Sequence, residues 1–454
     1  MSTMAPSALQ VSTGPMLNKQ AKLAMFSQFL GFMLDAYDMG LVLILAPILV
    51  KVFASPKGSA TWQYMTILFT YSITMAARPV GSAVFGHFAD KIGRRRLLVI
   101  TIGGIGIMSL LGGLLPTYQE IGVWSYVMFC VLRFFMGCFF GGEYAIGHTF
   151  AIEHAPANKR GAIGGFIQSG FPLGYVFASL VFALISALLT KAAMTQFGWR
   201  IAFITGVMPV LLAMYIRTRL HESPEFEKAK AKGMMDKTPF LSLFKPPALG
   251  TFLQVFFFMT GLFLTDYSVY GFLPNLLTLN GRGFDPTTYS LIYGFALFVA
   301  FLGYNFYGWL SDYTGRKVLT QWYTVFLMVF GVPVFYVLYH AALQRNIWMA
   351  VLGTTMAGLL KLAWGIVPAY LCERFPTSRR ATGVGVGYSS GALIGAWFGA
   401  YVWWVHKIPF IANIEKGDLW LSPAVILTIG ALMTLASLFF SPETKDLHLD
   451  DVKS

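Results

Sequence analysis

Charged side chains are scarce in this sequence. Asp, Glu, Lys and Arg together make up 12% of its 454 residues, whereas a soluble globular domain carries about 25%. Hydrophobic residues make up 56% of the chain. So few charges cannot cover the surface of a water-soluble protein of this length, and the composition therefore indicates a protein that lies in a membrane.

Motifs for catalysis or nucleotide binding are also missing. Cys130, Cys138 and Cys372 lack metal-ligand spacing, so we interpret them as small buried hydrophobes. The Gly-rich stretch GVGVG begins at Gly383 after a basic loop rather than a strand, and no Lys-Ser or Lys-Thr follows it. ATP-driven transport is therefore unsupported. Because no catalytic triad, metal cluster or cofactor fingerprint occurs either, we expect a protein that is not an enzyme and uses no cofactor.

Long apolar runs divide the chain into membrane-spanning segments. A transmembrane helix needs about 20 mostly apolar residues, and runs such as LVLILAPILV do not alternate as the strands of a β-barrel would. No apolar core precedes the first run, so no secretory signal is predicted. We predict twelve transmembrane helices, at about 25–50, 64–88, 97–115, 124–151, 161–189, 200–217, 248–277, 288–310, 318–341, 347–371, 382–405 and 421–440.

The basic residues are unevenly distributed between the predicted loops. The formal net charge of +13, taken alone, suggests a nucleic-acid partner. Of the 33 Lys and Arg residues, however, 22 fall on one side of the predicted membrane and 8 on the other. Because Lys and Arg are enriched in cytoplasmic loops, this asymmetry predicts that both termini and the central loop face the cytoplasm. We therefore expect a multi-pass protein of the inner or plasma membrane, in contact with the lipid bilayer and not with nucleic acid.

The second half of the chain repeats motifs of the first half. GHFADKIGRRRLL, from Gly86, and GWLSDYTGRKVL, from Gly308, share Gly, Asp, Gly and Arg at an offset of 222 residues. EHAPANKR and ERFPTSRR follow at an offset of 220, and SPE recurs at an offset of 218. Three motifs in the same order indicate a tandem duplication of six helices, and an even number gives both halves the same orientation. The predicted units are a cytoplasmic tail (1–24), a six-helix bundle (25–217), a cytoplasmic linker (218–247), a second six-helix bundle (248–441) and a cytoplasmic tail (442–454).

These motifs resemble those of a known family. GHFADKIGRRR is similar to the signature loop of the major facilitator superfamily. RPVGSAVFGHFADKIGRRRLL, RFFMGCFFGGEYAIGHTFAIEHAPANKRG and ESPEF resemble its metabolite–proton and sialate–proton symporter branches, and DAYD (Asp35 to Asp38) resembles the sialate, aromatic-acid and monocarboxylate symporters. The resemblance covers essentially the whole chain. It implies an all-α polytopic membrane fold of twelve helices in two parallel six-helix halves, and the transport of organic acids.

The repeated phrase lies in the predicted turn between the second and third helices of each half. Asp90 and Arg94 in the first copy, and Asp312 and Arg316 in the second, can pair locally or cap backbone groups. An orientation anchor made of positive charge is the alternative, but it does not explain the fixed Gly–Asp–Gly–Arg spacing. We therefore expect these four residues to form a latch that closes the cytoplasmic side.

Ionisable residues inside predicted spans cost at least about 2.5 kcal/mol each, so each needs a function or a partner. Asp35 and Asp38 lie one turn apart on the first helix and repel when both are ionised. We expect at least one of them, Asp38 first, to bind a proton near neutral pH; the alternative is pairing with a neighbouring Arg. Glu143 is a further candidate proton site, or else a structural partner of Arg94, Arg160 or a similar residue.

Two cations inside predicted spans, one in each half, indicate an anionic substrate. Arg133 either holds a substrate carboxylate or exchanges partners with an aspartate of the first helix, and a permanent ion pair is the alternative. Lys361, near mid-span, either attracts the anion or pairs with Asp266. Asp266 is itself a candidate residue of the substrate site. Arg78 is interpreted as structural. The other candidate substrate ligands are Trp364, as an apolar wall, and Gln168, Tyr37, Tyr388 and Asn305, as hydrogen-bonding groups.

Together these features predict a secondary active transporter that works by alternating access. We expect proton-coupled uptake of a small organic anion, a carboxylate above all. The alternatives are the export of drugs or metabolites and the uptake of a neutral sugar-like solute. The expected partners are the anionic substrate, the proton and the lipid bilayer, and we expect the protein to be a monomer.

Overall fold

The computed structural model describes residues 18–55, 57, 60–279, 282–445, 447, 449 and 452. These residues form helices joined by short turns, and no β-strand occurs among them. The predicted all-α fold is confirmed. Residues 1–17 of the predicted amino-terminal tail and several residues after Lys445 lie outside the described part.

Helical segments cover all twelve predicted spans. Ten segments of the described chain are long and apolar enough to cross a membrane. The predicted span 64–88 lies within α2, a helix of 33 residues, and the predicted span 382–405 falls on α18, of 16 residues, and on α19 after it. Apolar runs adopt this structure because a helix satisfies its backbone hydrogen bonds internally where no water is present.

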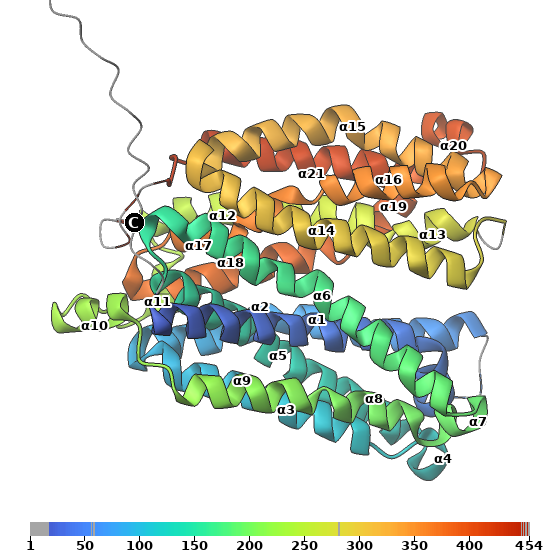
Figure 1. Cartoon of the computed structure of the whole chain (residues 1–454), viewed down its shortest axis with the longest axis horizontal. Coiled ribbons are helices and arrows are strands. Elements are labelled where there is room, and N and C mark those ends of the chain that lie inside the picture. Colours follow the sequence, from blue (N-terminus) through green and yellow to red (C-terminus); the bar gives the residue numbers. More distant parts are fainter. Residues whose placement is uncertain are drawn as a thin grey trace, which may run out of the picture.

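The helices form two bundles that lie side by side (Figure 1). The shorter helices α10 (Pro224–Ala231) and α11 (Pro239–Ser242) lie between the two bundles in the sequence. The first bundle comprises α1 (Lys19–Phe53), α2 (Ala60–Ile92), α3 (Arg94–Leu114), α4 (Tyr118–Ile121), α5 (Val123–Glu153), α6 (Arg160–Leu188), α7 (Lys191–Ala193), α8 (Trp199–Thr205) and α9 (Val207–Thr218). The second comprises α12 (Ala248–Asp266), α13 (Leu273–Thr278), α14 (Pro286–Thr314), α15 (Arg316–Gln344), α16 (Ile347–Leu359), α17 (Val367–Cys372), α18 (Arg380–Gly395), α19 (Phe398–His406), α20 (Pro409–Glu415) and α21 (Leu421–Phe439).

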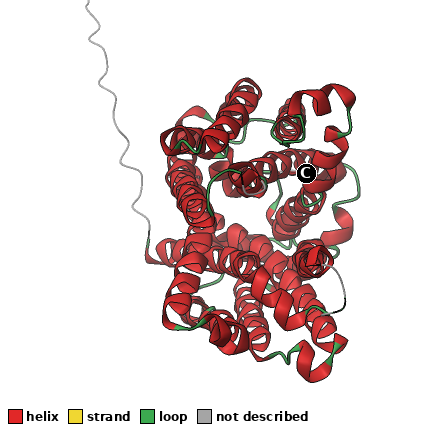
Figure 2. Cartoon of the chain, turned by 90° about the vertical axis from the view of Figure 1, so that its right-hand side faces the viewer, coloured by secondary structure: helices red, strands yellow, loops and turns green. Residues whose placement is uncertain are grey.

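The bundles meet along two main pairs of helices, α2 with α18 and α6 with α14. Viewed from the end, the two bundles lie one above the other and meet across the middle of the molecule (Figure 2). The turns after α2 and α14 lie at the same end of the molecule, at the left of Figure 1, together with α10, α11 and the carboxyl-terminal segment. Because the basic turns Arg94–Arg95–Arg96 and Arg316–Lys317 lie there, we call this end the basic end.

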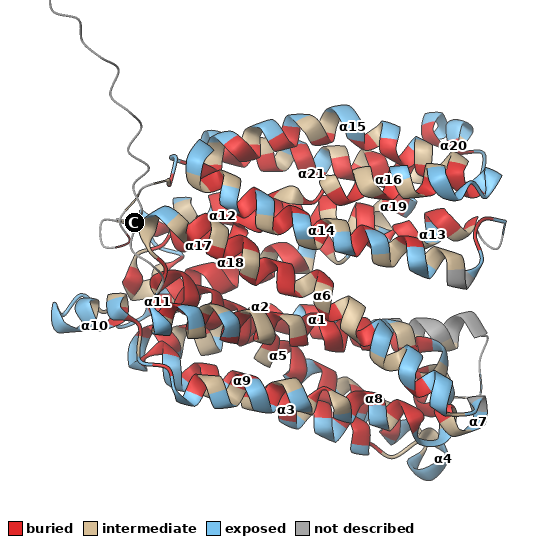
Figure 3. Ribbon diagram, viewed as in Figure 1, coloured by how far each residue is buried: buried red, intermediate tan, exposed pale blue. Residues whose placement is uncertain are grey.

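Large apolar side chains cover much of the outer surface of the bundles. Leu188, Leu291 and Trp348 are 75%, 72% and 83% exposed, and the buried residues concentrate between the helices and between the two bundles (Figure 3). An apolar outer surface of this extent is stable only in contact with an apolar solvent such as lipid tails. The exposed residues therefore indicate the face that the protein presents to the bilayer.

Glycines bring α2 and α5 into backbone contact within the first bundle. A Cβ atom at Gly81 would lie 1.9 Å from the carbonyl oxygen of Cys138, and one at Gly137 would lie 2.2 Å from the carbonyl oxygen of Thr74. Small residues allow this approach, as is common between membrane helices. The close contact places the α5 side chain of Arg133 directly beside α2.

Two helices of the second bundle are interrupted inside their spans. A π-helical turn, η3 (Tyr267–Gly271), follows α12, and a 3₁₀ turn, η5 (Leu362–Ile366), follows α16. Asp266 is the last residue of α12, and Lys361 directly precedes η5. Non-helical backbone inside a membrane span is tolerated where it is buried in protein, and such breaks are frequent at functional sites.

The start of α16 depends on a side-chain cap. Asn346 accepts a hydrogen bond from the backbone N–H of Met349 at 3.1 Å. We expect Asn346→Ala to lower the free energy of unfolding by about 1 kcal/mol, because a helix N–H then loses its partner. A fall of a few degrees in the thermal unfolding temperature of the purified protein would verify this. Asn346→Asp retains the acceptor and should unfold at the temperature of the unmodified protein; equal losses in both variants would contradict the cap.

Candidate functional site

Each aspartate of α1 pairs with an arginine of a different helix. Asp35 forms an ion pair with Arg78 of α2, and Asp38 pairs with Arg133 of α5 at 2.5 Å. Arg133 also donates from Nε to Thr74 Oγ1 at 3.1 Å. All five side chains are buried. The two carboxylates therefore do not share a partner, although they lie one turn apart.

The second bundle contributes a third buried pair. Lys361 pairs with Asp266, and its Nζ lies 4.0 Å from the ring centre of Tyr270. The Asp266 side chain is 16% exposed, compared with 2% for Asp35 and 5% for Asp38. Of the two arrangements expected for Lys361, the structure shows the ion pair with Asp266. This pair is also more open to its surroundings than the two pairs of the first bundle.

Tyrosines from both bundles fill the space between these pairs. Tyr267 of η3 directly follows Asp266, and Tyr388 of α18 directly precedes Ser389, whose hydroxyl lies 2.8 Å from that of Ser82, one turn after Arg78 on α2. The hydroxyl of Tyr267 also lies 3.7 Å from Met75 Sδ of α2. One pair of each bundle therefore lies beside the same group of aromatic side chains at the interface.

Next to these tyrosines, aromatic rings from the two bundles stack on each other. Tyr144 of α5 stacks on Tyr388 of α18 with ring centres 3.4 Å apart, and Trp364 lies 6.3 Å from the same Tyr388 ring. Four buried polar atoms in this region have no hydrogen-bond partner within the described part of the chain: Tyr144 Oη, His148 Nε2, Gln168 Oε1 and Trp364 Nε1. A buried polar group without a partner costs about 1–3 kcal/mol, so these four atoms are candidate partners for a polar ligand.

Three predicted site residues have partners inside a single bundle. Tyr37 donates to the carbonyl oxygen of Ala202 at 2.8 Å, and Asn305 donates to the carbonyl oxygen of Phe301, one turn earlier on α14, at 2.8 Å. Glu143 forms an ion pair with Arg217 of α9. The contacts of Glu143 correspond to the structural alternative, with Arg217 as the partner that the sequence did not single out.

At the basic end, each bundle caps a helix of the other. Asp90 at the end of α2 accepts hydrogen bonds from the N–H groups of Ala381 and Thr382 in the first turn of α18, at 3.1 and 2.8 Å. Asp312 at the end of α14 accepts from Gly161 and Ala162 in the first turn of α6, both at 2.8 Å. A carboxylate at a helix N-terminus satisfies free N–H groups and is favoured by the helix dipole. The repeated motif therefore joins the bundles through reciprocal caps.

Buried ion pairs complete the same interface. Glu153 of α5 contacts Arg94 of its own bundle at 2.9 Å and Arg380 of the other bundle at 2.7 Å. In the second bundle Arg316 contacts Glu373 at 3.3 Å and Asp312 at 2.9 Å. The carboxyl-terminal segment adds backbone acceptors, because Arg160 donates to the carbonyl oxygen of Leu447 at 2.7 Å and Arg380 donates to that of Leu449 at 2.9 Å. The basic end is thus closed in this structure.

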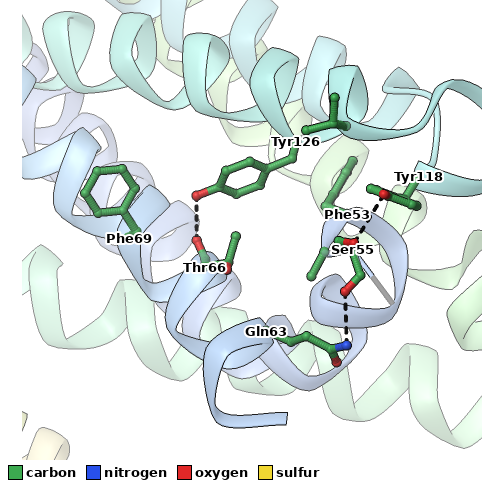
Figure 4. Close-up of a pocket in the computed structure, with 9 residues that line it drawn as sticks. Phe53, Ser55, Gln63, Thr66, Phe69, Tyr118 and Tyr126 are labelled. Atoms are coloured by element: carbon green, nitrogen blue, oxygen red, sulfur yellow. Dashed lines mark hydrogen bonds between the residues drawn. The ribbon is translucent and has the colours of Figure 1, made fainter. Parts of the chain in front are cut away.

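A pocket of about 520 Å³ lies near the opposite end, between α1, α2 and α5 (Figure 4). Its polar groups bond to one another, since Tyr126 donates to the carbonyl oxygen of Thr66 at 2.9 Å and Gln63 donates to that of Ser55 at 3.0 Å. The pocket lies within the first bundle, away from the three charged pairs. It therefore does not form part of the site at the interface.

The comparisons with known proteins agree with this architecture. Residues 28–400 match the Major Facilitator Superfamily. The chain is 32% identical over 444 residues to the inner membrane metabolite transport protein YhjE of Escherichia coli, covering 95% of this chain and 96% of that protein. It is 27% identical to the shikimate transporter of the same organism, covering 93% and 94% of the two chains.

A solved structure of the proton:xylose symporter XylE bound to 6-bromo-6-deoxy-D-glucose has a TM-score of 0.78 at 17% identity, covering 95% of this chain and 98% of that one. The same transporter in its inward open conformation has a TM-score of 0.64. The chain belongs to the Major Facilitator Superfamily. It is a multi-pass inner membrane protein and a secondary transporter of small solutes, not an enzyme.

Proposed function

We propose that the protein is a proton-coupled symporter that carries a small organic anion, a carboxylate, into the cell. The observation that supports this most directly is the balance of buried charge. Asp35, Asp38 and Asp266 are matched by Arg78, Arg133 and Lys361. An anion that entered alone would leave an unpaired charge in a medium of low dielectric constant, which is costly. A proton that accompanies it restores the balance.

Asp38 and Arg133 are proposed as the coupling pair. Their described partners, Thr74 included, belong to the first bundle. Of the two roles expected for Arg133, these contacts support the exchange of partners with an aspartate of α1. When Asp38 takes up a proton, Arg133 loses its counter-charge and the first bundle gains one positive charge. That added charge is balanced when an anion binds at the interface, where Lys361 lies.

Binding of the anion and the proton neutralises the interface and lowers the barrier to movement of one bundle against the other. The basic end then opens as Asp90 separates from the N-terminus of α18 and Asp312 from that of α6. Across the interface, Arg380 loses Glu153 and Arg94 loses the carbonyl oxygen of Thr377, whereas Arg316 keeps its partners within the second bundle. We propose that this end faces the cytoplasm, because most basic residues lie there. Release of the substrate and of the proton resets the cycle.

A hydroxylated solute is the second candidate within the same transport function. The partnerless atoms Gln168 Oε1 and Trp364 Nε1 belong to α6 and η5, one in each bundle, and Tyr144 Oη lies beside the stacked Tyr388 ring. Hydroxyl groups would satisfy such atoms, and the aromatic faces would cover the apolar side of a ring. One relative of this chain is named for shikimate, which combines a carboxylate with ring hydroxyls. A hydroxylated ring acid therefore fits both sets of groups.

The test is uptake by proteoliposomes under an imposed pH gradient, acidic outside. Shikimate, gluconate, benzoate, L-lactate and, as a neutral solute, D-xylose would be offered as labelled probes. We expect at least one carboxylate to accumulate, and we expect a protonophore to abolish this accumulation. Accumulation of D-xylose alone would contradict the proposal in favour of sugar uptake. Movement of the acids out of the vesicles, towards an acidified outside solution, would contradict it in favour of export.

Lys361→Gln tests whether Lys361 is the positive charge of the second bundle that attracts the anion, which we call the anion pole. We expect it to weaken binding of the accumulated carboxylate at least tenfold, because the positive charge at the interface is lost. The change would be measured as the apparent affinity in a thermal-shift titration. Lys407→Gln, at an exposed lysine of the end opposite to the basic end, is the matched control and should bind within twofold of the unmodified protein. Equal affinities in all three proteins would refute the anion pole.

A further inference from the structure

One face of α2 is directed at the second bundle along most of its length. Tyr71, Met75, Arg78, Ser82 and Gly86 recur every three or four residues, which places them on one side of a helix. Met75 Sδ lies 3.7 Å from the hydroxyl of Tyr267, and Ser82 Oγ lies 2.8 Å from Ser389 Oγ. A Cβ atom at Gly86 would lie 2.9 Å from the Cα atom of Thr382. Arg78 lies in the middle of this face.

The surroundings of Arg78 differ from those of Arg133. Arg78 lies between Met75 and Ser82 on α2, the two residues that contact Tyr267 and Ser389 of the second bundle. Tyr388, next to Ser389, stacks on Tyr144 of the first bundle, and its ring centre lies 6.3 Å from that of Trp364 in the second. Arg133, in contrast, contacts Asp38 and Thr74 within the first bundle.

We propose that Arg78, and not Arg133, is the cation by which the first bundle holds the substrate, opposite Lys361 of the second bundle. This proposal rests on the proposed function, because it assigns a residue to the anion site of that transporter. It replaces the structural role expected for Arg78 from the sequence. The ligand class is a carboxylate whose head group reaches the arginine while its body lies among the tyrosines.

The free hydrogen-bonding capacity of Arg78 suits this role. Its Nη2 donates to Asp35 and contacts Met39 Sδ at 3.1 Å, while its Nε has no partner among the residues that the structure describes. Nη1 of Arg133 lacks a described partner as well, so it is the position on the interface that distinguishes Arg78. A guanidinium offers two parallel N–H donors, which a carboxylate accepts together. The ring of Phe140 lies 5.4 Å from the guanidinium carbon and covers another side. A substrate carboxylate can therefore bind from the interface and take the place of Asp35 as counter-ion.

Two charge-balanced double variants provide the test. Asp35→Asn/Arg78→Gln removes the pair on the interface, and Asp38→Asn/Arg133→Gln removes the pair one turn away. Both replace one buried ion pair of the first bundle by amides of similar size. The affinity of each purified protein for shikimate, gluconate, benzoate and L-lactate would be measured by thermal-shift titration at one pH. The unliganded unfolding temperature reports whether each variant folds.

We expect Asp35→Asn/Arg78→Gln to weaken binding of the carboxylate that the unmodified protein binds by at least tenfold. We expect Asp38→Asn/Arg133→Gln to bind it within threefold, although it should no longer accumulate it. The reverse pattern, or binding within threefold in both, would overturn the assignment. If the first double variant does not fold, Arg78→Lys decides, because it keeps the charge and removes the bidentate fork: a tenfold loss supports the proposal and an unchanged affinity overturns it.

The Lys361 and Arg78 variants together distinguish a failure of the Arg78 assignment from a failure of the proposed anion transport. If Lys361→Gln binds every carboxylate as the unmodified protein does, the anion site itself is refuted, whatever the Arg78 variants show. If Lys361→Gln loses affinity and the Arg78 variants do not, the transporter of anions stands and the assignment of Arg78 fails.

Discussion

Replacing Asp38 by Asn is expected to abolish accumulation of the substrate while exchange of substrate across the membrane continues. An amide cannot bind and release the proton, so the pH gradient is no longer coupled to the movement of the bundles. A gradient of two pH units can drive about 100-fold accumulation when one proton moves with each substrate. In the Asp38→Asn protein the internal concentration should stop at the external one. Uptake of the labelled carboxylate into proteoliposomes, with and without the gradient, measures the ratio.

Counterflow in vesicles preloaded with unlabelled substrate shows whether the variant still transports. Asp236→Asn, at an acid of the linker that bonds to the backbone N–H of Thr238, is the matched control and should keep full accumulation. Accumulation by the Asp38→Asn protein equal to that of the control would remove Asp38 from the coupling mechanism. If the Asp38→Asn protein loses both counterflow and accumulation, the substitution has instead damaged the structure.

Substituting Glu153 by Gln should open the basic end. Glu153 is the shared partner of Arg94 and Arg380, so its loss leaves the buried Arg380 without its carboxylate and leaves Arg94 with Asp90 alone, at 3.4 Å. Breaking a buried pair from one side costs about 3–5 kcal/mol, and each 1.4 kcal/mol is about tenfold in an equilibrium. The proportion of molecules with an open basic end should therefore rise by about 100-fold or more.

The native Cys372 reports this opening. Its side chain is fully buried, so a water-soluble maleimide reaches it only after the bundles separate. With Cys130 and Cys138 replaced by Ser, the labelling rate of Cys372 should rise at least tenfold in the Glu153→Gln protein. Glu222→Gln is the control, since Glu222 accepts from the N–H groups of Arg94 and Arg95 within the first half of the chain. Equal labelling rates in both variants would contradict the closure role of Glu153.

Much of this architecture follows from the sequence because the physical signals are strong. A run of 20 apolar residues in lipid has few alternatives to a helix, and all twelve predicted spans are covered by helical segments. The repeated Gly–Asp–Gly–Arg spacing placed Asp90 and Asp312 in equivalent turns, and the family assignment from these motifs is confirmed. The sequence did not show that each aspartate caps a helix of the other bundle, because capping across bundles depends on how the two repeats are docked.

The choice of ion-pair partners could not be read from the chain. Asp35 and Asp38 lie on the same side of α1, yet a small difference in angle directs one to α2 and the other to α5. From the sequence alone, Arg78 is interpreted as structural because its RPVG motif is typical of the resembled families. Tyr71, Met75 and Ser82 share a helix face with Arg78, and this spacing could have placed Arg78 on the interface. The spacing can be interpreted only when it is known which face of α2 meets the second bundle.

The carboxyl-terminal segment is held through side chains at Glu443, Thr444 and Lys445 and, further on, through its backbone at Leu447 and Leu449. Arg160 and Arg380 donate to carbonyl oxygens at Leu447 and Leu449, and every amino acid carries such an oxygen. Evolution is therefore free to vary the identity of these residues, provided that the path of the segment is kept. The two arginines have no such freedom, because a lysine cannot present the same planar set of donors. Substitutions in related chains should therefore be frequent at the accepting residues Leu447 and Leu449 and rare at the donors Arg160 and Arg380.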